Sequence, residues 1–239
     1  MSGHSHWAGI KHKKAAQDAK RGKIFSKLGK LISVAAREKG GDPSMNPRLR
    51  IAIETAQKAN MPKENIERAI KKGAGEDGSE KLEEVTLEAY GPDGVAILIE
   101  VITDNKNRTL GDIKGVLSKH NGKLASEGSV KWMFSQKGSI TVDVANLDKE
   151  SAELKAIDAG AENIEWQDDE LIVYTNLENT EDAKQKLTDY GLPVQSSSVQ
   201  WVPQNPIKID ERQKEKLNRF FEALDDYDDV QEIYSNIAF

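Results

Sequence analysis

The hydrophobic periodicity of the chain changes at Gly73–Gly78, and this change most constrains the fold. Before this segment, apolar residues recur at helical spacing, whereas after it short runs rich in Val and Ile are typical of strands. The segment itself reads GAGEDG and matches the letters of a dinucleotide-binding loop. It follows a helical pattern rather than a strand, and it contains two acids that would repel a pyrophosphate. We therefore interpret it as a linker.

Three helices are predicted before the linker. The first runs from about residue 15 to residue 38 and stops at the breaker cluster Gly40-Gly41-Asp42-Pro43. The second has Asn46 as its cap and Pro47 at its first position, and the third begins at Pro62. Residues 1–14 offer little to bury, so we expect them to become ordered only with a partner.

Strand patterns dominate the rest of the chain. A hairpin is predicted around Gly91–Gly94, then a helix capped by Asn105 or Asn107, and then a strand containing Val130, Trp132 and Phe134. Residues 136–203 follow the order β-α-β-β-α-β, which is ferredoxin-like. The helix and strand after residue 203 have no partners of their own, so we expect them to complete the domain that begins at residue 79.

The sequence thus predicts an α+β protein with an N-terminal three-helix domain and two α/β domains. The last of these is ferredoxin-like and is inserted into the middle one. The predicted domains are residues 1–78, residues 79–135 together with 204–239, and residues 136–203.

Charge divides the chain at the same place. Residues 1–75 carry 17 Lys/Arg and 6 Asp/Glu, whereas residues 76–239 carry 17 Lys/Arg and 34 Asp/Glu. A basic domain joined to an acidic body is expected to bind a polyanion such as nucleic acid with one end. Attraction between the two halves of the same molecule would explain the asymmetry as well.

Lysines line one face of the first predicted helix, beside an apolar face that serves its own domain. Lysine outnumbers arginine here, which favours contacts with a phosphate backbone over reading of bases. Trp7 is a candidate for stacking on a base, with packing against a neighbouring domain as an equal alternative. The polar loop at residues 105–109 would suit a phosphate, although capping by asparagine explains part of it. The predicted nucleic-acid contacts are Trp7, Lys11, Lys13, Lys14, Lys20, Arg21, Lys23, Lys27, Lys30, Arg48, Arg50, Asn105 and Arg108.

The composition argues against an enzyme. The chain has no cysteine, and three of its four histidines lie in the N-terminal arm. His120 is predicted at a helix C-terminus, where it suits the helix dipole. The acidic clusters at residues 168–170 and 225–229 lack the spacing of a calcium loop, so we interpret the first as a tight turn and the second as a solvated loop. If Met1 is removed, Ser2-Gly3-His4 could chelate Cu²⁺ or Ni²⁺, but we assign no metal and no cofactor.

No apolar run approaches the length of a membrane span, and the N-terminus lacks the apolar segment of a secretory signal. We therefore expect a cytoplasmic protein that has nucleic acid as its partner and neither a membrane nor a small-molecule substrate. A monomer is the expected state.

Four long segments of the chain closely resemble the YebC/PmpR family of bacterial regulators and their mitochondrial relatives. These segments are HSHWAGIKHKKAAQDAKRGKIFSKL, NPRLRIAIETAQKANMPKENIERAIKKG, EAYGPDGVAILIEVITDNKNRT and GSVKWMF. The resemblance implies a three-domain α/β architecture without enzymatic activity, and a function as a DNA-binding transcriptional regulator. A second view of the family implies a ribosome-associated factor that helps translation through proline runs.

The residues and the resemblance leave three functions open. We take a DNA-binding transcriptional regulator as the first hypothesis. A translation factor that binds ribosomal RNA is the alternative, because a lysine-rich face without base-reading side chains suits exposed RNA phosphates at least as well. A non-catalytic scaffold that uses its acidic body for protein contacts is the third.

Overall fold

The computed structural model describes residues 17–75 and 81–238, with only the backbone described for residues 17–20. This part of the chain contains helices and two four-stranded sheets, which confirms the predicted α+β class. The elements form three bodies, which we call the helical body, the middle body and the inserted unit. The predicted domain boundaries at residues 78, 135 and 203 stay predictions.

The helical body consists of α2 (Gln17–Lys39), α3 (Pro47–Lys58) and α4 (Lys63–Gly73). Asn46 caps α3 as predicted, because its side-chain oxygen accepts a hydrogen bond from the backbone N–H of Leu49 at 3.1 Å. Helices α2 and α4 approach so closely that a Cβ added at Gly73 would stand 2.1 Å from the Ser33 carbonyl oxygen. A buried cap and small residues at the contacts thus hold these helices together.

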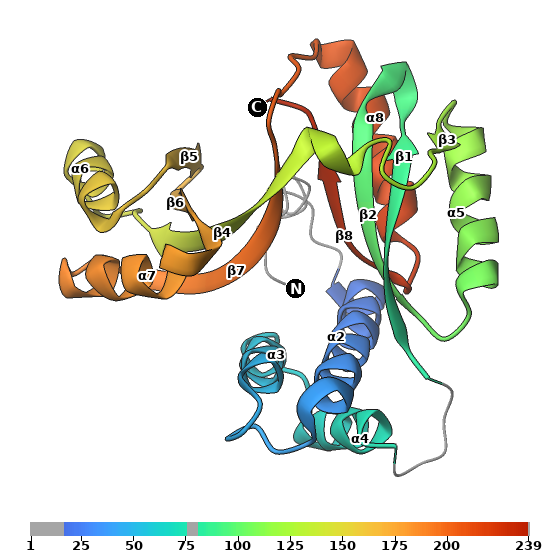
Figure 1. Ribbon diagram of the computed structural model, residues 1–239, viewed down its shortest axis with the longest axis horizontal. Coiled ribbons are helices and arrows are strands. Elements are labelled where there is room, and N and C mark those ends of the chain that lie inside the picture. Colours follow the sequence, from blue (N-terminus) through green and yellow to red (C-terminus); the bar gives the residue numbers. More distant parts are fainter. Residues whose placement is uncertain (1–16, 76–80, 239) are drawn as a thin grey trace.

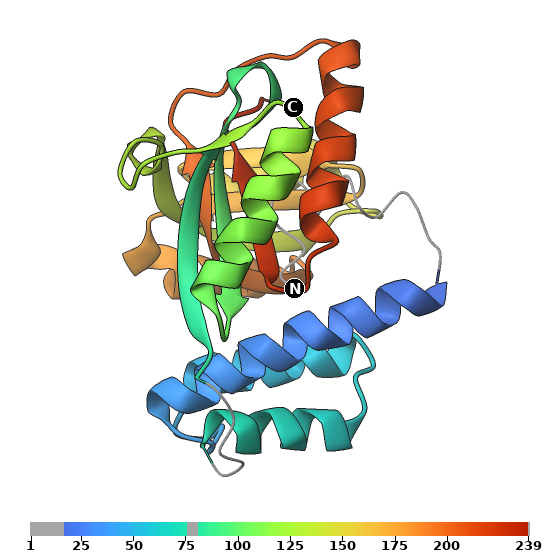
Figure 2. The same cartoon turned by 90° about the vertical axis from the view of Figure 1, so that its right-hand side faces the viewer.

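The middle body is built on an antiparallel sheet with the strand order β3-β1-β2-β8. Its elements are β1 (Glu83–Tyr90), η1 (Pro92–Gly94), β2 (Ala96–Thr103), α5 (Lys106–Lys119), β3 (Lys123–Leu124), α8 (Glu211–Asp225) and β8 (Val230–Ser235). Helices α5 and α8 lie side by side on one face of this sheet (Figure 2). Ile99, Leu117 and Phe220 are fully buried in the core between the helices and the sheet.

The inserted unit has the second sheet, with the strand order β5-β6-β4-β7. Its elements are β4 (Phe134–Asp143), α6 (Lys149–Ala159), β5 (Asn163–Gln167), β6 (Glu170–Thr175), η3 (Leu177–Asn179), α7 (Thr180–Asp189) and β7 (Val194–Pro203). Helices α6 and α7 cover one face, where Ile140, Val173 and Leu187 are buried. Because β8 returns to pair with β2 of the first sheet, the predicted insertion of a ferredoxin-like unit is confirmed.

The middle body is the centre of the molecule. Figure 1 shows the helical body below it and the inserted unit at its side. Helix α2 runs along the lower edge of the middle body, as Figure 2 shows from the side. The helical body therefore presents α2 to the middle body and keeps part of α3 and α4 on the outside.

One predicted strand is wrong. Instead of a strand through Val130 and Trp132, the chain forms a short 3-10 helix, η2 (Lys131–Met133), and β4 begins only at Phe134. The reason is a buried carboxylate on β1. Glu88 accepts hydrogen bonds from the backbone N–H groups of Val130 and the next residue, at 2.6 and 2.7 Å. These N–H groups are therefore not available to a neighbouring strand.

Candidate nucleic-acid interface

Several predicted contacts cannot be placed. Trp7, Lys11, Lys13 and Lys14 lie outside the described residues, as does the Ser2-Gly3-His4 segment, and the side chain of Lys20 lies outside as well. The other predicted contacts fall on α2, on α3 and at the start of α5.

The lysines of α2 face an acidic loop of the same chain. We call Lys23, Lys27 and Lys30 the lysine face. Residues 225–229, which run from the last residue of α8 to the residue before β8, form what we call the acidic loop. Lys27 lies at the centre of the contact, because its side chain is only 2% exposed. Its Nζ lies 2.7 Å from Asp225 Oδ1 and 3.0 Å from the carbonyl oxygen of the same residue. A lysine buried to this degree requires such partners.

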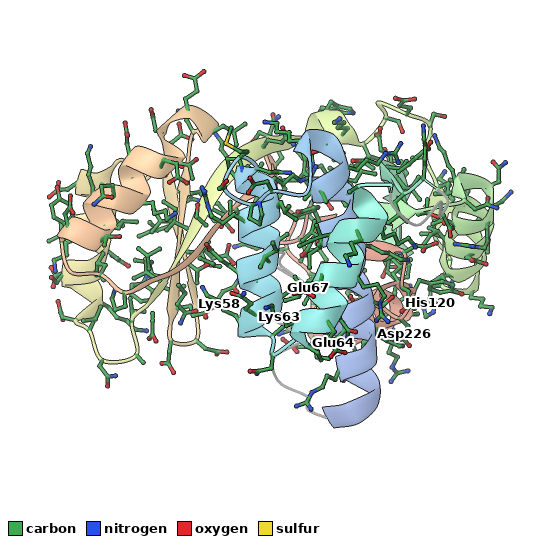
Figure 3. All side chains as sticks on the ribbon, turned by 90° about the horizontal axis from the view of Figure 1, so that it is seen from below. Lys58, Lys63, Glu64, Glu67, His120 and Asp226 are labelled. Atoms are coloured by element: carbon green, nitrogen blue, oxygen red, sulfur yellow. The ribbon has the colours of Figure 1, made fainter. Side chains whose placement is uncertain are left out.

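The two flanking lysines repeat this arrangement at more exposed positions. Lys23 Nζ donates to Asp226 Oδ1 at 2.7 Å, and these two side chains are 43% and 72% exposed. Lys30 binds the carboxylate of Asp229 and donates to the carbonyl oxygen of Asp228 at 3.0 Å. Figure 3 shows Asp226 beside α2, seen from below. The interpretation of the acidic loop as a solvated loop is therefore wrong, because the lysine face packs on it.

Asp229 connects this contact to the start of α5. Its second carboxylate oxygen accepts hydrogen bonds from Thr109 Oγ1 at 2.6 Å and from Arg108 at 3.4 Å. Burial alone would raise the pKa of Asp229, but the bonds from Lys30 and from these two donors outweigh burial and lower that pKa. Asp229 is therefore a stable anion at neutral pH, held by residues from two bodies.

Asn105 caps α5. Its side-chain oxygen accepts a hydrogen bond from the backbone N–H of Arg108 at 3.1 Å, which is the capping role that the sequence left as the simpler explanation. Arg108 also pairs with Asp104 at 2.8 Å, while 52% of its side chain stays exposed. The polar loop thus keeps exposed donors, although part of its hydrogen-bonding capacity is used within the chain.

The predicted arginines of the helical body differ in how they are used. Arg48 pairs with Glu38 at 2.6 Å and with Glu84 of β1, so it joins α3 to the middle body. Arg21 and Arg50 are exposed. Further exposed cations that the sequence analysis did not single out lie on α4, at Lys63, Arg68 and Lys71. In the sequence, these cations belong to the polar face of an amphipathic helix. Basic and acidic residues occur together on that face, so the pattern does not single out the cations.

At the lysine face, the residues that accept the hydrogen bonds were not predicted from the sequence. Lys27 and Asp225 stand 198 positions apart, so no local pattern connects them. A signal existed in the run DDYDD at residues 225–229, because four acids in five positions match the charge of α2. Complementary charge would have suggested the pairing without specifying its geometry.

The described residues show little other chemistry. Within residues 17–75 and 81–238, no group of three or more His, Cys, Asp or Glu is placed to hold a metal ion. No helix of this part is long and apolar enough to cross a membrane. His120 packs its ring against that of Phe220, with the ring centroids 5.6 Å apart. The strongest electrostatic feature is thus the contact of the lysine face with the acidic loop.

Known proteins match the chain along nearly its whole length. The family model "TACO1/YebC protein N-terminal domain" matches residues 5–76, and the model "TACO1/YebC second and third domain" matches residues 82–237. A "probable transcriptional regulatory protein" of Halothermothrix orenii is 48% identical over 239 residues, which cover 99% of this chain and 94% of the relative. A protein of the same name from Fervidobacterium nodosum is 50% identical over 237 residues, with coverages of 99% and 93%. The crystal structure of a conserved hypothetical protein from Aquifex aeolicus has a TM-score of 0.87 at 46% identity, and the match covers 98% of this chain and 97% of that one.

Proposed function

The chain belongs to the TACO1/YebC family, and from this premise we propose that it is a nucleic-acid-binding regulator of gene expression that acts on transcription. The names of its relatives support the choice of process. The observation that carries nucleic-acid binding is the charge of the helical body, because residues 21–75 hold 13 Lys/Arg and only 5 Asp/Glu. Such a surface attracts a polyanion.

The contacts of the lysine face support binding to a phosphate backbone. Lys27 and Lys30 each donate to a carboxylate oxygen and to a carbonyl oxygen through one ammonium group. Lysine contacts phosphate oxygens through the same point charge, without the paired geometry that arginine uses to read bases. The acidic loop therefore occupies the lysine face as a phosphate backbone would. In our proposal the two compete for it.

Because the acidic loop competes with the ligand, the lysines differ in how easily the ligand reaches them. Lys23 can exchange its partner at little cost, because an exposed ion pair contributes at most about 1 kcal/mol. Lys27 is buried, so a ligand reaches it only after the acidic loop has moved away from α2. We therefore take Lys23, together with the exposed Arg21 and Arg50, as the first contacts. The deeper lysines then join only in an opened form.

Asp226→Asn tests this competition, because it removes the partner of Lys23 and leaves the buried pair of Lys27 in place. Binding of a DNA duplex and of a structured RNA is measured by fluorescence anisotropy at several salt concentrations. We expect the variant to bind up to about fivefold more tightly than the wild type. Lys23→Gln should bind more weakly, with a salt slope smaller by about one unit.

Asp93→Asn is the matched control. Asp93 pairs with Lys216 at 2.9 Å on the β1–β2 turn, with side chains 37% and 42% exposed, and its loss changes the net charge equally. Equal gains from the two Asn variants would show that net charge alone matters and would contradict competition. A wild-type chain that binds neither nucleic acid at low salt would overturn the proposed function.

Crosslinking in cells with sequencing separates transcription from the translational alternative. Reads at promoter DNA support the proposed process. Reads confined to ribosomal RNA would replace it with a role in translation, with the same lysine face as the contact. An absence of enriched nucleic acid, together with stable protein partners, would instead favour the scaffold.

A further inference from the structure

A buried carboxylate fixes the shape of the loop that joins β3 to β4. Glu88 is 6% exposed and accepts hydrogen bonds from the backbone N–H groups of Gly128, Val130 and Lys131, at 2.5, 2.6 and 2.7 Å. Burial alone would raise the pKa of Glu88, but these donors and the charge of Lys131 outweigh burial and lower that pKa. The carboxylate is thus ionised at neutral pH, and it orders residues 125–133 before any ligand arrives.

The loop exposes a tryptophan. Trp132 is 66% exposed, which is unusual for so large an apolar side chain. Its indole N–H is already used, because it donates to the carbonyl oxygen of Ser129 at 2.9 Å. The hydroxyl of Tyr90 donates to the same oxygen at 3.3 Å, so two aromatic side chains converge there. Trp132 therefore offers a ring face rather than a hydrogen-bond donor to a ligand.

Two lysines lie over aromatic rings of this region other than that of Trp132. Lys123 Nζ lies 5.9 Å from the centroid of the Tyr90 ring, and Lys131 Nζ lies 5.0 Å from the centroid of the Trp201 ring. Both lysines are exposed, and Glu127 is an exposed acid in the same loop. Aromatic rings next to cations are typical of proteins that bind single-stranded nucleic acid, because bases stack on the rings and phosphates contact the positive charges.

We propose that Trp132 stacks on an unpaired base of a single-stranded nucleic acid, with Lys123 and Lys131 beside it for the neighbouring phosphates. The inference rests on the proposed function and specifies its ligand as a strand with accessible bases. The site is a second contact, since Figure 1 shows the segment between β3 and β4 in the upper half of the view, away from the helical body. A strand that contacts both places would span the middle body.

A protein partner fits this surface less well. Among the described residues from 81 to 146, Trp132 is the one large hydrophobic side chain that is mostly exposed. Protein docking surfaces need a contiguous apolar patch at their centre, and charged side chains are depleted there. A single exposed aromatic ring with lysines nearby is instead suited to stack on one base.

Trp132→Ala in the full chain tests the inference, with Trp132→Phe as the conservative variant. The probes are a short single-stranded RNA of mixed sequence and the duplex that it forms with its complement. We expect Trp132→Ala to bind the single strand about tenfold more weakly and the duplex as the wild type does, because paired bases have no free face. Trp132→Phe should keep most of the affinity. Leu154→Ala is the matched control, since Leu154 on α6 is 59% exposed, and it should change neither.

The outcomes distinguish this inference from the proposed function. Unchanged binding of the single strand by Trp132→Ala overturns the inference alone, as does an equal loss for strand and duplex. A wild-type chain that binds neither RNA probe overturns the inference, and it overturns the proposed function as well only if the chain also fails to bind the DNA duplex. Thermal unfolding should show nearly the same melting temperature for all variants, because the side chain is mostly exposed. A selective loss for the single strand at an unchanged melting temperature supports stacking.

Discussion

The middle body holds its two neighbours by junctions of different kinds. The junction to the helical body is mainly ionic, made by the lysine face on the acidic loop and by Arg48 on Glu84, with one small apolar cluster beside them. The junction to the inserted unit is mainly apolar and aromatic, where Phe134, Tyr234 and Trp201 pack together. Salt and polyanions weaken ionic contacts far more than apolar ones. In our proposal, the helical body is therefore the part that a nucleic acid displaces.

Continuous strands strengthen this contrast. Strands β4 and β7 leave the middle body as a pair, with Phe134 opposite Pro203 at its edge and further pairs along the inserted unit. In comparison, α3 reaches the inserted unit through Lys58, whose Nζ donates to the carbonyl oxygen of Gln195 at 2.9 Å. Figure 3 shows Lys58 on the side of α3 that faces this unit. The inserted unit is thus fixed to the middle body by continuous strands, while the helical body is held mainly by side-chain ion pairs, of which the Lys23–Asp226 pair is open to solvent ions.

The largest effect is expected at the apolar junction. Phe134→Ala removes a ring that is 4% exposed, and it should lower the free energy of unfolding by about 3–5 kcal/mol. This loss should be nearly the same at low and high salt, because no charge is involved. Urea unfolding at two salt concentrations measures it. A loss that shrinks strongly in salt would contradict the division into an ionic and an apolar junction.

Lys27→Ala should give the next largest effect. It leaves Asp225 without its buried partner, and breaking such a pair costs about 3 kcal/mol or more. Lys27→Met separates charge from packing, since it keeps an apolar stem of similar length. If Lys27→Met keeps most of the wild-type stability, the apolar stem of the side chain holds α2 in place and the ion pair does not. The junction between the helical body and the middle body would then be apolar as well. Urea unfolding of both variants decides this.

Acid should affect the two junctions in opposite directions. The lowered pKa of Asp229 means that its stabilising contribution is complete above its unfolded pKa of about 3.9 and is lost as the pH falls through the lower folded value. In the apolar junction, burial raises the pKa of Glu100, which outweighs the hydrogen bond from Trp201. Its ionised form is therefore unfavourable above that raised pKa, and the penalty disappears as the pH falls through it.

Two variants measure this difference by unfolding between neutral and acidic pH. Asp229→Asn should be less stable than the wild type at neutral pH, and the deficit should shrink in acid. Glu100→Gln should be as stable as the wild type or more stable at neutral pH, and any gain should likewise vanish in acid. Parallel pH profiles for the two variants would show that the junctions do not differ in this respect.

The smallest effect is expected for Lys23→Ala. Its pair with Asp226 is largely exposed, so the loss should be at most about 1 kcal/mol and should disappear in high salt. The comparison with Lys27→Ala keeps the partner type and the helix constant while burial changes. Equal losses from both would imply that burial does not determine the strength of the ionic junction.

Local signals predicted the elements of the fold well. Asn46-Pro47 predicted the start of α3, and the sequence Gly91-Pro92-Asp93-Gly94 predicted the turn between β1 and β2. The leftover strand near residue 230 led to the insertion, because a strand needs a partner. These predictions succeed for two reasons. Caps and turns depend on residues close in sequence, and a strand without a neighbouring strand has to pair elsewhere in the fold.

Long-range side-chain contacts were not predictable in the same way. Charge complementarity pointed to attraction between the two halves, but it did not place Lys27 on Asp225. In the sequence, Trp132 fits a strand pattern. It lies in a loop because Glu88 on β1 accepts hydrogen bonds from the backbone N–H groups of the two residues before it. The nucleic-acid contacts named from the sequence stay predictions. What the structure adds is that three of these lysines already have partners.

The pairing of β8 with β2 ties the completion of the first sheet to the synthesis of residues 230–235. Ile97 lies opposite Ser235, and the side chain of Asn236 accepts a hydrogen bond from the backbone N–H of Ala96 at 2.9 Å. On the ribosome, β2 emerges long before its partner, while the inserted unit already has all four of its own strands. Until β8 emerges, β2 keeps an open edge, and open sheet edges are sites at which nascent chains associate with one another. A chain that stops shortly before residue 230 would therefore carry its helical body and inserted unit on a sheet with an unpaired edge.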